Sequence, residues 1–275
     1  MKARLNCLIV QTASLYPKPM TSKTKTLAAV PSQRYSKPPI LEAVIEFRLS
    51  EPLSARTVGK VSRKLKRGYS TTREQKEVTF QLNVVQGQTH VNDEITYFEH
   101  ASDDQTDVLV VKPENLIWSR RAPYEGWQSF INRVHRELQV ALETIGYCRI
   151  ARIGLRYINR IDVPSDNPPQ SRTFRYEDYI TINLTLPPKL DPIGGYLWRI
   201  ERQFPELALN ATLQSGTLIP ELPEMASFLL DVDVFTTEEL PVKIDDIAPK
   251  LEEMRKLKNE LFELSISDVA RRVFE

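Results

Sequence analysis

The chain has 275 residues, of which 41% are hydrophobic and 27% charged, a composition typical of a globular protein that buries a sizeable core. No apolar run approaches the roughly 18 residues that a membrane helix needs. The two cysteines, Cys7 and Cys148, lie far apart and form no CxxC pair. We therefore expect no membrane contact and no disulfide framework, and a cytoplasmic location.

The charge is unevenly distributed, although the formal net charge is only +1. Residues 1–36 contain six basic and no acidic residues and show no sustained periodicity, so we expect a flexible basic extension. Residues 37–275 hold the remaining 31 basic and all 36 acidic residues. A mildly acidic body disfavours strong non-specific binding of nucleic acid, because such binding depends on neutralising phosphates.

The first half of the body, residues 37–146, is predicted to fold as a strand, a helix, four strands and a long helix. Apolar and polar residues alternate from Leu41 to Leu49, which is typical of a half-buried strand. Ser54 is a suitable N-cap for the helix that follows. The expected strands are 41–49, 78–84, 91–99, 107–112 and 115–121, and the expected helices are 54–66 and 124–145.

The second half, residues 147–275, opens with a long strand from Ile153 to Val163. Because side chains alternate along a strand, Arg156, Arg160 and Asp162 share one face and the apolar residues share the other. The later expected strands are 180–186, 195–203, 206–214 and 226–235, and the expected helices are 244–264 and 267–274.

The order of elements repeats, which predicts an α+β fold made of two similar β-α-β4-α halves. Placed side by side, two such halves would form a largely antiparallel, curved sheet backed by helices. The TATA-binding protein has this element order twice and forms a saddle, so we expect a similar topology. Topology by itself does not determine function.

Motifs of common enzyme classes are missing from the sequence. It has no GxxxxGK[ST] or GxGxxG phosphate-binding loop and no GxSxG elbow. His90, His100 and His135 do not lie at metal-ligand spacing from another histidine or a cysteine, so we expect structural or solvated histidines. We predict no cofactor and no catalytic residues.

Two carboxylates are weak candidates for a metal site. Asp231 and Asp233 point to the same face of a strand and could bind a divalent cation, with Glu201 as a further group for a metal-dependent hydrolase. Alternatively, the two aspartates belong to the solvent-exposed, charged face of a strand. We favour this interpretation because the sequence shows no clear third ligand.

Polar residues on the strands are the main candidates for ligand binding. If helices cover one side of the sheet, amides, hydroxyls and guanidinium groups line the other side, where they could contact a peptide, a glycan or base edges. The solvent face of an antiparallel sheet has the same pattern. The candidate ligand-binding residues are Arg156, Asn159, Arg160, Arg199, Asn183 and Asn210.

More specific structural predictions can be made for three residues. We expect Arg156 to be partly buried and paired with a carboxylate, namely Glu42, Glu46, Asp231 or Asp233, and Arg160 to be more exposed. We expect Trp127 to pack in the core, although a role as a ligand platform is the alternative.

Five segments occur together in the body of the chain. They are PPILEAVIEFR at 38–48, PYEGW at 123–127, GLRYINRI at 154–161, LDVD at 230–233, and NELFE at 259–263 with ISD at 266–268. In this combination the chain resembles a sporadically distributed, uncharacterised family of prokaryotic proteins of about this length. The resemblance implies no particular activity. Its patchy distribution suggests a mobile or defence-associated gene context.

These observations favour a non-catalytic binding or adaptor protein that holds a protein partner, or a second copy of itself, through the open sheet face or the C-terminal helix. One alternative is a nucleic-acid-binding protein that uses Arg156, Arg160, Arg199 and the basic N-terminal arm. Another is the metal-dependent hydrolase with Asp231 and Asp233.

Overall fold

The computed structural model describes residues 35–83, 88–164, 176–183, 187, 189, 195–222, 224–238 and 244–275, with the backbone alone for 78–83, 88–95 and 244. Within these residues the fold is α+β, with nine strands in one sheet and four helices. The strands are β1 Ile40–Leu49, β2 Thr71–Asn83, β3 Gln88–Ala101, β4 Asp107–Val111, β5 Asn115–Arg121, β6 Ile150–Pro164, β7 Leu197–Phe204, β8 Leu209–Leu218 and β9 Met225–Thr236. The helices are α1 Ala55–Leu65, α2 Trp127–Ile145, α3 Ile244–Ser265 and α4 Asp268–Phe274.

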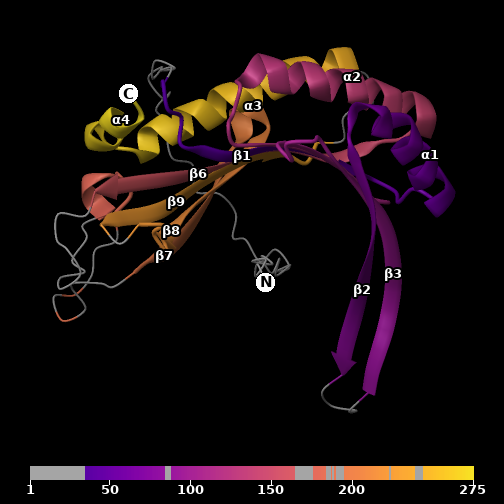
Figure 1. Ribbon diagram of the computed structural model, residues 1–275, viewed down its shortest axis with the longest axis horizontal. Helices are drawn as coiled ribbons and strands as arrows, with labels where there is room; N and C mark the ends of the chain where they lie inside the picture. The colour runs from indigo at the N-terminus through magenta and orange to yellow at the C-terminus, as the bar shows by residue number, and fades with distance from the viewer. Residues whose placement is uncertain are drawn as a thin grey trace.

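The sheet has the strand order β2-β3-β4-β5-β1-β6-β9-β8-β7, and neighbouring strands are antiparallel. The opening strands of the two sequence halves, β1 and β6, therefore pair with each other, with Ile45 opposite Leu155. The sheet is curved, the helices lie over its convex side, and none of the four covers the concave side (Figure 1). No helix in the described part of the chain is long and apolar enough to cross a membrane.

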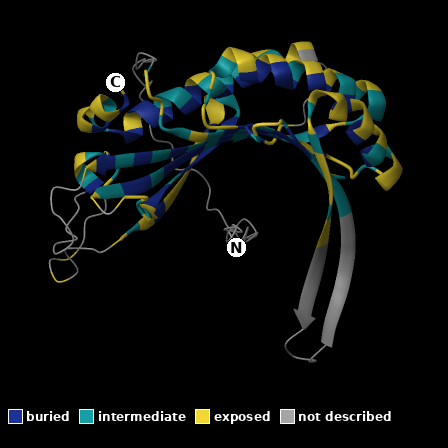
Figure 2. Ribbon diagram, viewed as in Figure 1, coloured by how far each residue is buried: buried dark blue, intermediate teal, exposed yellow. Residues whose placement is uncertain are grey.

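The core lies between the helices and the convex face of the sheet (Figure 2). Alternation along β1 and β6 turns one set of side chains to this side, and the helices α1, α2 and α3 each add an apolar stripe. The stripes are Val58, Val61 and Leu65 in α1, Phe130, Val134, Leu138 and Ala141 in α2, and Ile247, Leu251, Met254 and Leu261 in α3.

Local signals place the helix ends where the sequence predicts them. Ser54 accepts a hydrogen bond from the backbone N–H of Thr57, and Ser267 accepts one from Ala270, so both serines act as N-caps. Gly146 follows the last residue of α2 with a φ of 83°, a conformation that disfavours side chains larger than glycine.

The strand expected at 180–186 is wrong for the residues that the structure describes there. Tyr176–Asp178 forms a 3-10 turn, and Ile180 makes a single bridge with Ile266. The backbone groups of this segment bond to the junction of α3 and α4: the N–H of Thr181 donates to Ser265, and the carbonyl of Tyr179 accepts from Ser267. Residues 184–186 lie outside the described residues.

The boundary of the N-terminal extension also needs correction. Tyr35 packs edge-on against Phe262 and Phe274, with ring centres 6.4 and 5.4 Å away. The backbone N–H of Lys37 donates to the carbonyl of Phe274 at 2.9 Å. Tyr35 and Ser36 therefore belong to the folded body. Periodicity could not reveal this, because the contacts come from the other end of the chain.

Candidate functional site

The concave face of the sheet carries a ladder of ion pairs across its central strands. Arg152 of β6 joins Glu46 of β1 at 2.6 Å and Asp233 of β9 at 2.9 Å. Arg156 bonds Asp231 through its Nε at 2.9 Å. The expected pairing of Arg156 with a carboxylate is confirmed, whereas Arg152, which bridges two strands, was not among the predicted residues.

The expected order of exposure of the two predicted arginines is wrong. The side chain of Arg160 is 17% exposed and that of Arg156 is 42% exposed. Arg160 packs against Asp162, Ser227 and Glu221, which together surround its guanidinium. The buried member of the other pair is the carboxylate of Asp231, with 7% exposure.

The remaining predicted ligand-binding residues do not converge on one place. Arg199 pairs with Glu201 two residues along β7 and is more than half exposed. Asn210 lies on β8, and Asn183 is exposed and belongs to none of the sheet strands. Asn159 lies on the opposite, helix-covered side and is 2% exposed, with its Nδ2 donating to the carbonyl of Leu230 at 2.9 Å.

Arginines hold the two aspartates that were candidates for a metal. Asp231 binds Arg156 and Asp233 binds Arg152. Burial raises the pKa of Asp233, and Arg152 opposes that shift. Glu201 is two strands away, opposite Thr212, and pairs with Arg199. Among the described residues no group of three or more His, Cys, Asp or Glu side chains is placed to hold a metal ion.

A hollow lies on the other, helix-covered side, and we call it the central cavity. It has a volume of about 700 Å³. Its walls come from the entry segment 35–40, residues 124–128 around the first turn of α2, Tyr157 and Asn159 of β6, and one side of α3. The residues of α3 on this wall are Glu252, Arg255, Lys258, Asn259, Phe262 and Glu263.

Aromatic side chains form much of the wall of the central cavity. Tyr157 is 2% exposed, and its hydroxyl lies 2.6 Å from that of Tyr124. Burial raises the pKa of Tyr157 well above its usual value and that of Tyr124 to about 12, so both phenols stay neutral near pH 7. Trp127 is half-buried, and its indole N–H donates to Glu252. Trp127 is therefore both a packing residue and part of the cavity wall.

Lys258 is the unusual residue of the cavity. The residue is only 8% exposed, and its Nζ lies 3.7 Å from the centre of the Tyr157 ring. Burial lowers the pKa of Lys258 from 10.5 to about 7; Arg255 lowers it further, and Glu263 opposes the shift. Near neutral pH this lysine is therefore close to its titration point.

The other charged groups on the wall are neutralised within the protein. Glu252 accepts from Arg255 at 2.8 Å. Glu125 pairs with Arg120, and Glu263 binds Arg271 and the hydroxyl of Tyr35. Among the described residues on this wall, Lys258 is the one charged side chain without an ion pair or a hydrogen bond to a neighbour.

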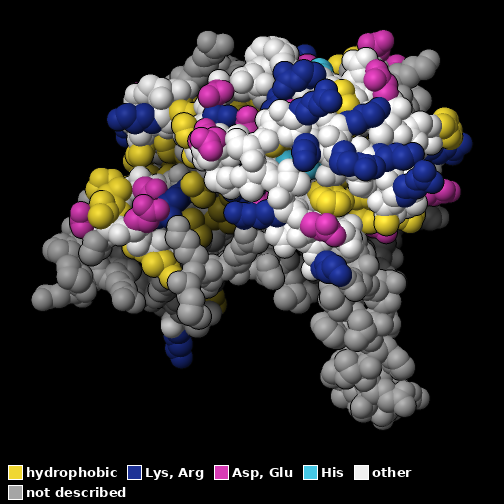
Figure 3. Space-filling view, turned by 45° about the vertical axis from the view of Figure 1, so that its right-hand side comes forward, with side chains coloured by type: hydrophobic (Ala, Val, Ile, Leu, Met, Phe, Trp, Pro, Cys, Tyr) yellow, Lys and Arg dark blue, Asp and Glu magenta, His cyan; other side chains and the backbone are white. Residues whose placement is uncertain are grey.

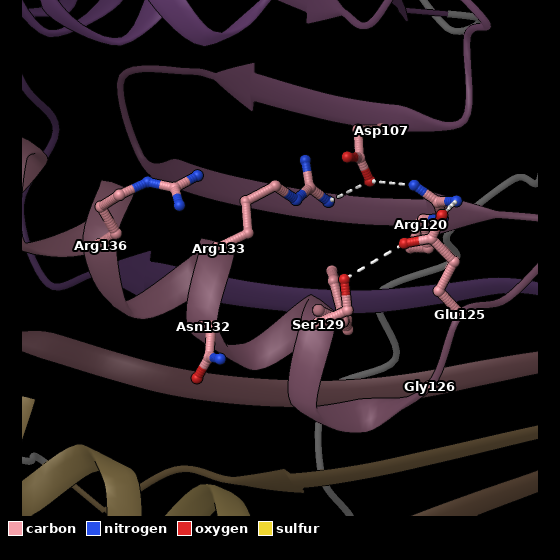
Figure 4. A pocket seen from close by; sticks show the side chains of 9 residues that line it. Asp107, Arg120, Glu125, Gly126, Ser129, Asn132, Arg133 and Arg136 are labelled. Carbon is pink, nitrogen blue, oxygen red and sulfur yellow. Dashed lines mark hydrogen bonds and ion pairs between the residues drawn. The ribbon is translucent and has the colours of Figure 1, made fainter.

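A second hollow, of about 330 Å³, lies at the start of α2 (Figure 4). Arg120 and Arg133 both reach Asp107 at 3.2 Å, and Arg120 also binds Glu125. Arg133 further donates to the carbonyl of Ser119. These contacts connect α2 to β4 and β5, so the two buried arginines have structural partners.

His100 has the structural role predicted for the histidines, whereas the buried Nε2 of His135 has no hydrogen-bond partner among the described residues. His100 is fully buried, and its ring nitrogens lie 3.1 Å from Ser62 Oγ and 2.9 Å from Thr72 Oγ1. Burial, followed by the charge of Lys66, lowers the pKa of His100 to about 4. Burial also lowers the pKa of His135. The side chain of His90 lies outside the described residues.

Sequence reasoning did not identify Lys258, although a signal was available. The apolar stripe of α3 runs through Leu251, Met254 and Leu261 at helical spacing. Position 258 falls on the same stripe, four residues after Met254 and three before Leu261. A lysine within the apolar stripe of a helix is either a buried charge or a functional group.

No family model matches the chain, and no curated protein matches it significantly.

Proposed function

We propose that this protein is a non-catalytic binding protein that holds a protein partner by accepting a carboxylate of that partner in the central cavity, beside Lys258. The observation that carries the proposal is the buried ammonium group of Lys258 on the cavity wall, which makes no ion pair among the described residues and feels the charge of Glu263, itself bound to Arg271, only without direct contact. The residues Lys258, Trp127 and Tyr157 would contact the ligand.

A bound carboxylate would resolve the electrostatic conflict at Lys258. Burying a charge is costly unless the charge is paired, and burial and Arg255 already shift this lysine toward its neutral form. A carboxylate next to the amine favours the charged form and makes a charge-assisted hydrogen bond. Ligand binding and protonation of Lys258 would therefore support each other.

The rest of the wall favours a ligand with one negative charge and an apolar body. Glu125, Glu252 and Glu263 line the same cavity and are each paired with an arginine, so Lys258 supplies the single positive charge that matches one carboxylate better than a multiply charged phosphate ester. Trp127, which is half-buried on this wall, offers aromatic surface to an apolar side chain. A volume of about 700 Å³ lies within the range of ligand sites in proteins. A short peptide segment with a carboxylate meets these conditions.

The other functions suggested by the sequence have less support. On the concave face, Arg152, Arg156 and Arg160 are each paired with carboxylates, so these arginines of the described part of that face are not free cations for nucleic acid. The same pairs occupy Asp231 and Asp233, which disfavours a metal-dependent hydrolase. Of the two binding surfaces proposed from the sequence, the C-terminal helix α3 is thus preferred over the open sheet face.

We also propose that the chain belongs to the sporadic prokaryotic family. Most of the sequence segments that carry this resemblance contribute to the central cavity. Parts of the segments 38–48, 123–127, 154–161 and 259–263 all contribute to the wall.

We further propose an internal duplication with a saddle topology. In support, the strands of the first half run outward from the centre of the sheet in the order β1-β5-β4-β3-β2, and those of the second half in the order β6-β9-β8-β7. The second half thus mirrors the order of the first, with one strand fewer. A cytoplasmic location is proposed because Cys148 is a free thiol.

An array of short random peptides, each with a free and an amidated C-terminus, tests the proposed function. At about pH 6, where Lys258 is protonated, retained peptides should be enriched in a carboxylate at one position. The two versions of each peptide distinguish a C-terminal from a side-chain carboxylate. Lys258→Met should weaken binding about tenfold or more, the loss expected for a charged hydrogen bond.

Lys256→Met is the matched control, because Lys256 is an exposed lysine two residues away on the same helix. It should bind the selected peptides like the unmodified protein. Affinity of the unmodified protein should also fall as the pH rises above about 7, since the lysine then loses its charge. Equal retention by Lys258→Met and the unmodified protein, or no enrichment of acids, would contradict the proposal.

A further inference from the structure

A separate surface of the protein is strongly basic. Helix α1 and the turn after it, Lys66–Gly68, hold six basic and no acidic residues. All six are exposed, and they are Arg56, Lys60, Arg63, Lys64, Lys66 and Arg67. Lys and Arg side chains gather over the face formed by the first two helices (Figure 3). This surface is distinct from the central cavity, whose wall contains no residue of α1.

Four of these cations form one stripe along the helix. Arg56, Lys60 and Arg63 follow one another at spacings of four and three residues, which places them on one side of α1, and Arg67 follows four residues later in the 3-10 turn that continues the helix. At about 1.5 Å per residue the stripe is about 16 Å long. We call these four residues the basic stripe.

Internal partners do not neutralise the basic stripe. Within the described residues no ion pair joins any of its four members to an acidic side chain, and Arg63 donates only to the carbonyl of Gly59 at 3.1 Å. The arginines of the concave face differ, because each of them binds a carboxylate. The excess positive charge of the stripe is thus available to an external anion.

The apolar side of α1 is turned fully into the protein. Val58, Val61 and Leu65 are at most 4% exposed, and α1 contributes none of the exposed large hydrophobic residues of the described chain. Peripheral membrane helices combine a basic face with an apolar face that enters the lipid. Since α1 has no such apolar face to offer, its surface suits a rigid polyanion better than a membrane.

We propose that the basic stripe binds the phosphate backbone of double-stranded nucleic acid without reading its sequence. Duplex DNA carries one charge per about 1.7 Å of its axis, so a stripe about 16 Å long can face several phosphates. The stripe contains no aromatic residue on which an unpaired base could stack, which favours a duplex over a single strand. This surface would act independently of the carboxylate-binding cavity.

Fluorescence anisotropy with a labelled duplex of mixed sequence tests the proposal on the full chain. The logarithm of the binding constant should fall linearly with the logarithm of the salt concentration. In the variant Arg56→Gln/Lys60→Gln/Arg67→Gln the magnitude of that slope should decrease by roughly 0.9 for each phosphate that the variant no longer neutralises. Replacing Arg56 and Arg67 by lysine keeps the charge and should preserve the slope.

The matched control removes three exposed cations from other surfaces, in Arg202→Gln/Lys256→Gln/Arg272→Gln. Both triple variants have the same net charge, so net charge alone predicts equal reductions in affinity. The proposal requires a clearly larger reduction from the stripe variant. Equal reductions, or no binding of the duplex by the unmodified protein at low salt, would overturn it. Stripe-dependent binding to phosphatidylserine vesicles without binding to the duplex would also overturn it and assign the surface to membranes.

Discussion

The Nζ atom of Lys258 lies 3.7 Å from the centre of the Tyr157 ring, inside the helix-covered side of the sheet. Tyr157 is 2% exposed and Lys258 is 8% exposed. The ring attracts the ammonium group, whereas burial disfavours its charge. The stability of the protein should therefore depend on the protonation of this one lysine.

Lys258→Met should remove a pH dependence of the free energy of unfolding between about pH 7 and pH 10.5. The pKa of Lys258 is about 7 in the folded state and 10.5 in the unfolded chain. The unfolded chain thus binds more protons in this window, so the unmodified protein gains stability as the pH rises. Urea unfolding at several pH values measures this gain. Lys256→Met should keep the full dependence, and an unchanged slope in Lys258→Met would contradict the assigned pKa.

Arg156→Ala should destabilise the protein more than Arg160→Ala. Removing Arg156 leaves the buried carboxylate of Asp231 without its guanidinium, a loss of about 3 kcal/mol. Removing Arg160 leaves Asp162, which is 41% exposed and can be hydrated, so the loss is about 1 kcal/mol. Chemical denaturation of the two variants measures the difference. The double variant Arg156→Met/Asp231→Leu should regain much of the lost stability, and a larger loss in Arg160→Ala would reverse the assignment.

Tyr35→Ala should lower the free energy of unfolding by about 2 kcal/mol, because it removes aromatic contacts with Phe262 and Phe274. Tyr35→Phe keeps the ring and loses only the hydrogen bond to Glu263, so it should cost less, about 1 kcal/mol. Thermal melts of both variants measure these effects. Deletion of residues 1–36 should likewise destabilise the protein relative to deletion of residues 1–34. Equal stability of the two deletions would show that Tyr35 does not hold the C-terminal helices.

His100 should make the protein less stable in acid. Its pKa is about 4 in the folded state and 6.5 in the unfolded chain, so the unfolded chain binds more protons between these values. Stability is therefore lost as the pH falls from about 6.5 to about 4. His100→Asn should weaken this dependence. An NMR titration gives a direct measurement, and a His100 pKa near 6.5 would contradict the burial of the ring.

Local sequence patterns were sufficient to predict the buried side of the two central strands and of the long helices, apart from single positions such as Asn159 and Lys258. The alternation in β1 and β6 separates Ile45 and Leu155 from Arg156, because successive side chains of a strand point to opposite faces. The N-cap Ser54 and the terminal Gly146 mark helix ends through bonds and angles within a few residues. The α+β class and most strand positions follow from such short-range signals.

Partners across the sheet and across the chain were decided by the tertiary structure alone. Strand periodicity does not say that Arg152 faces Glu46 and Asp233, since those residues are distant in the sequence. The segment near Ile180 alternates like a strand, yet its backbone bonds to the junction of α3 and α4 instead. The central cavity has the same origin: only long-range packing brings Tyr35, Trp127, Tyr157 and Lys258 to one wall, because a local pattern specifies which side of an element is buried and not what lies against it.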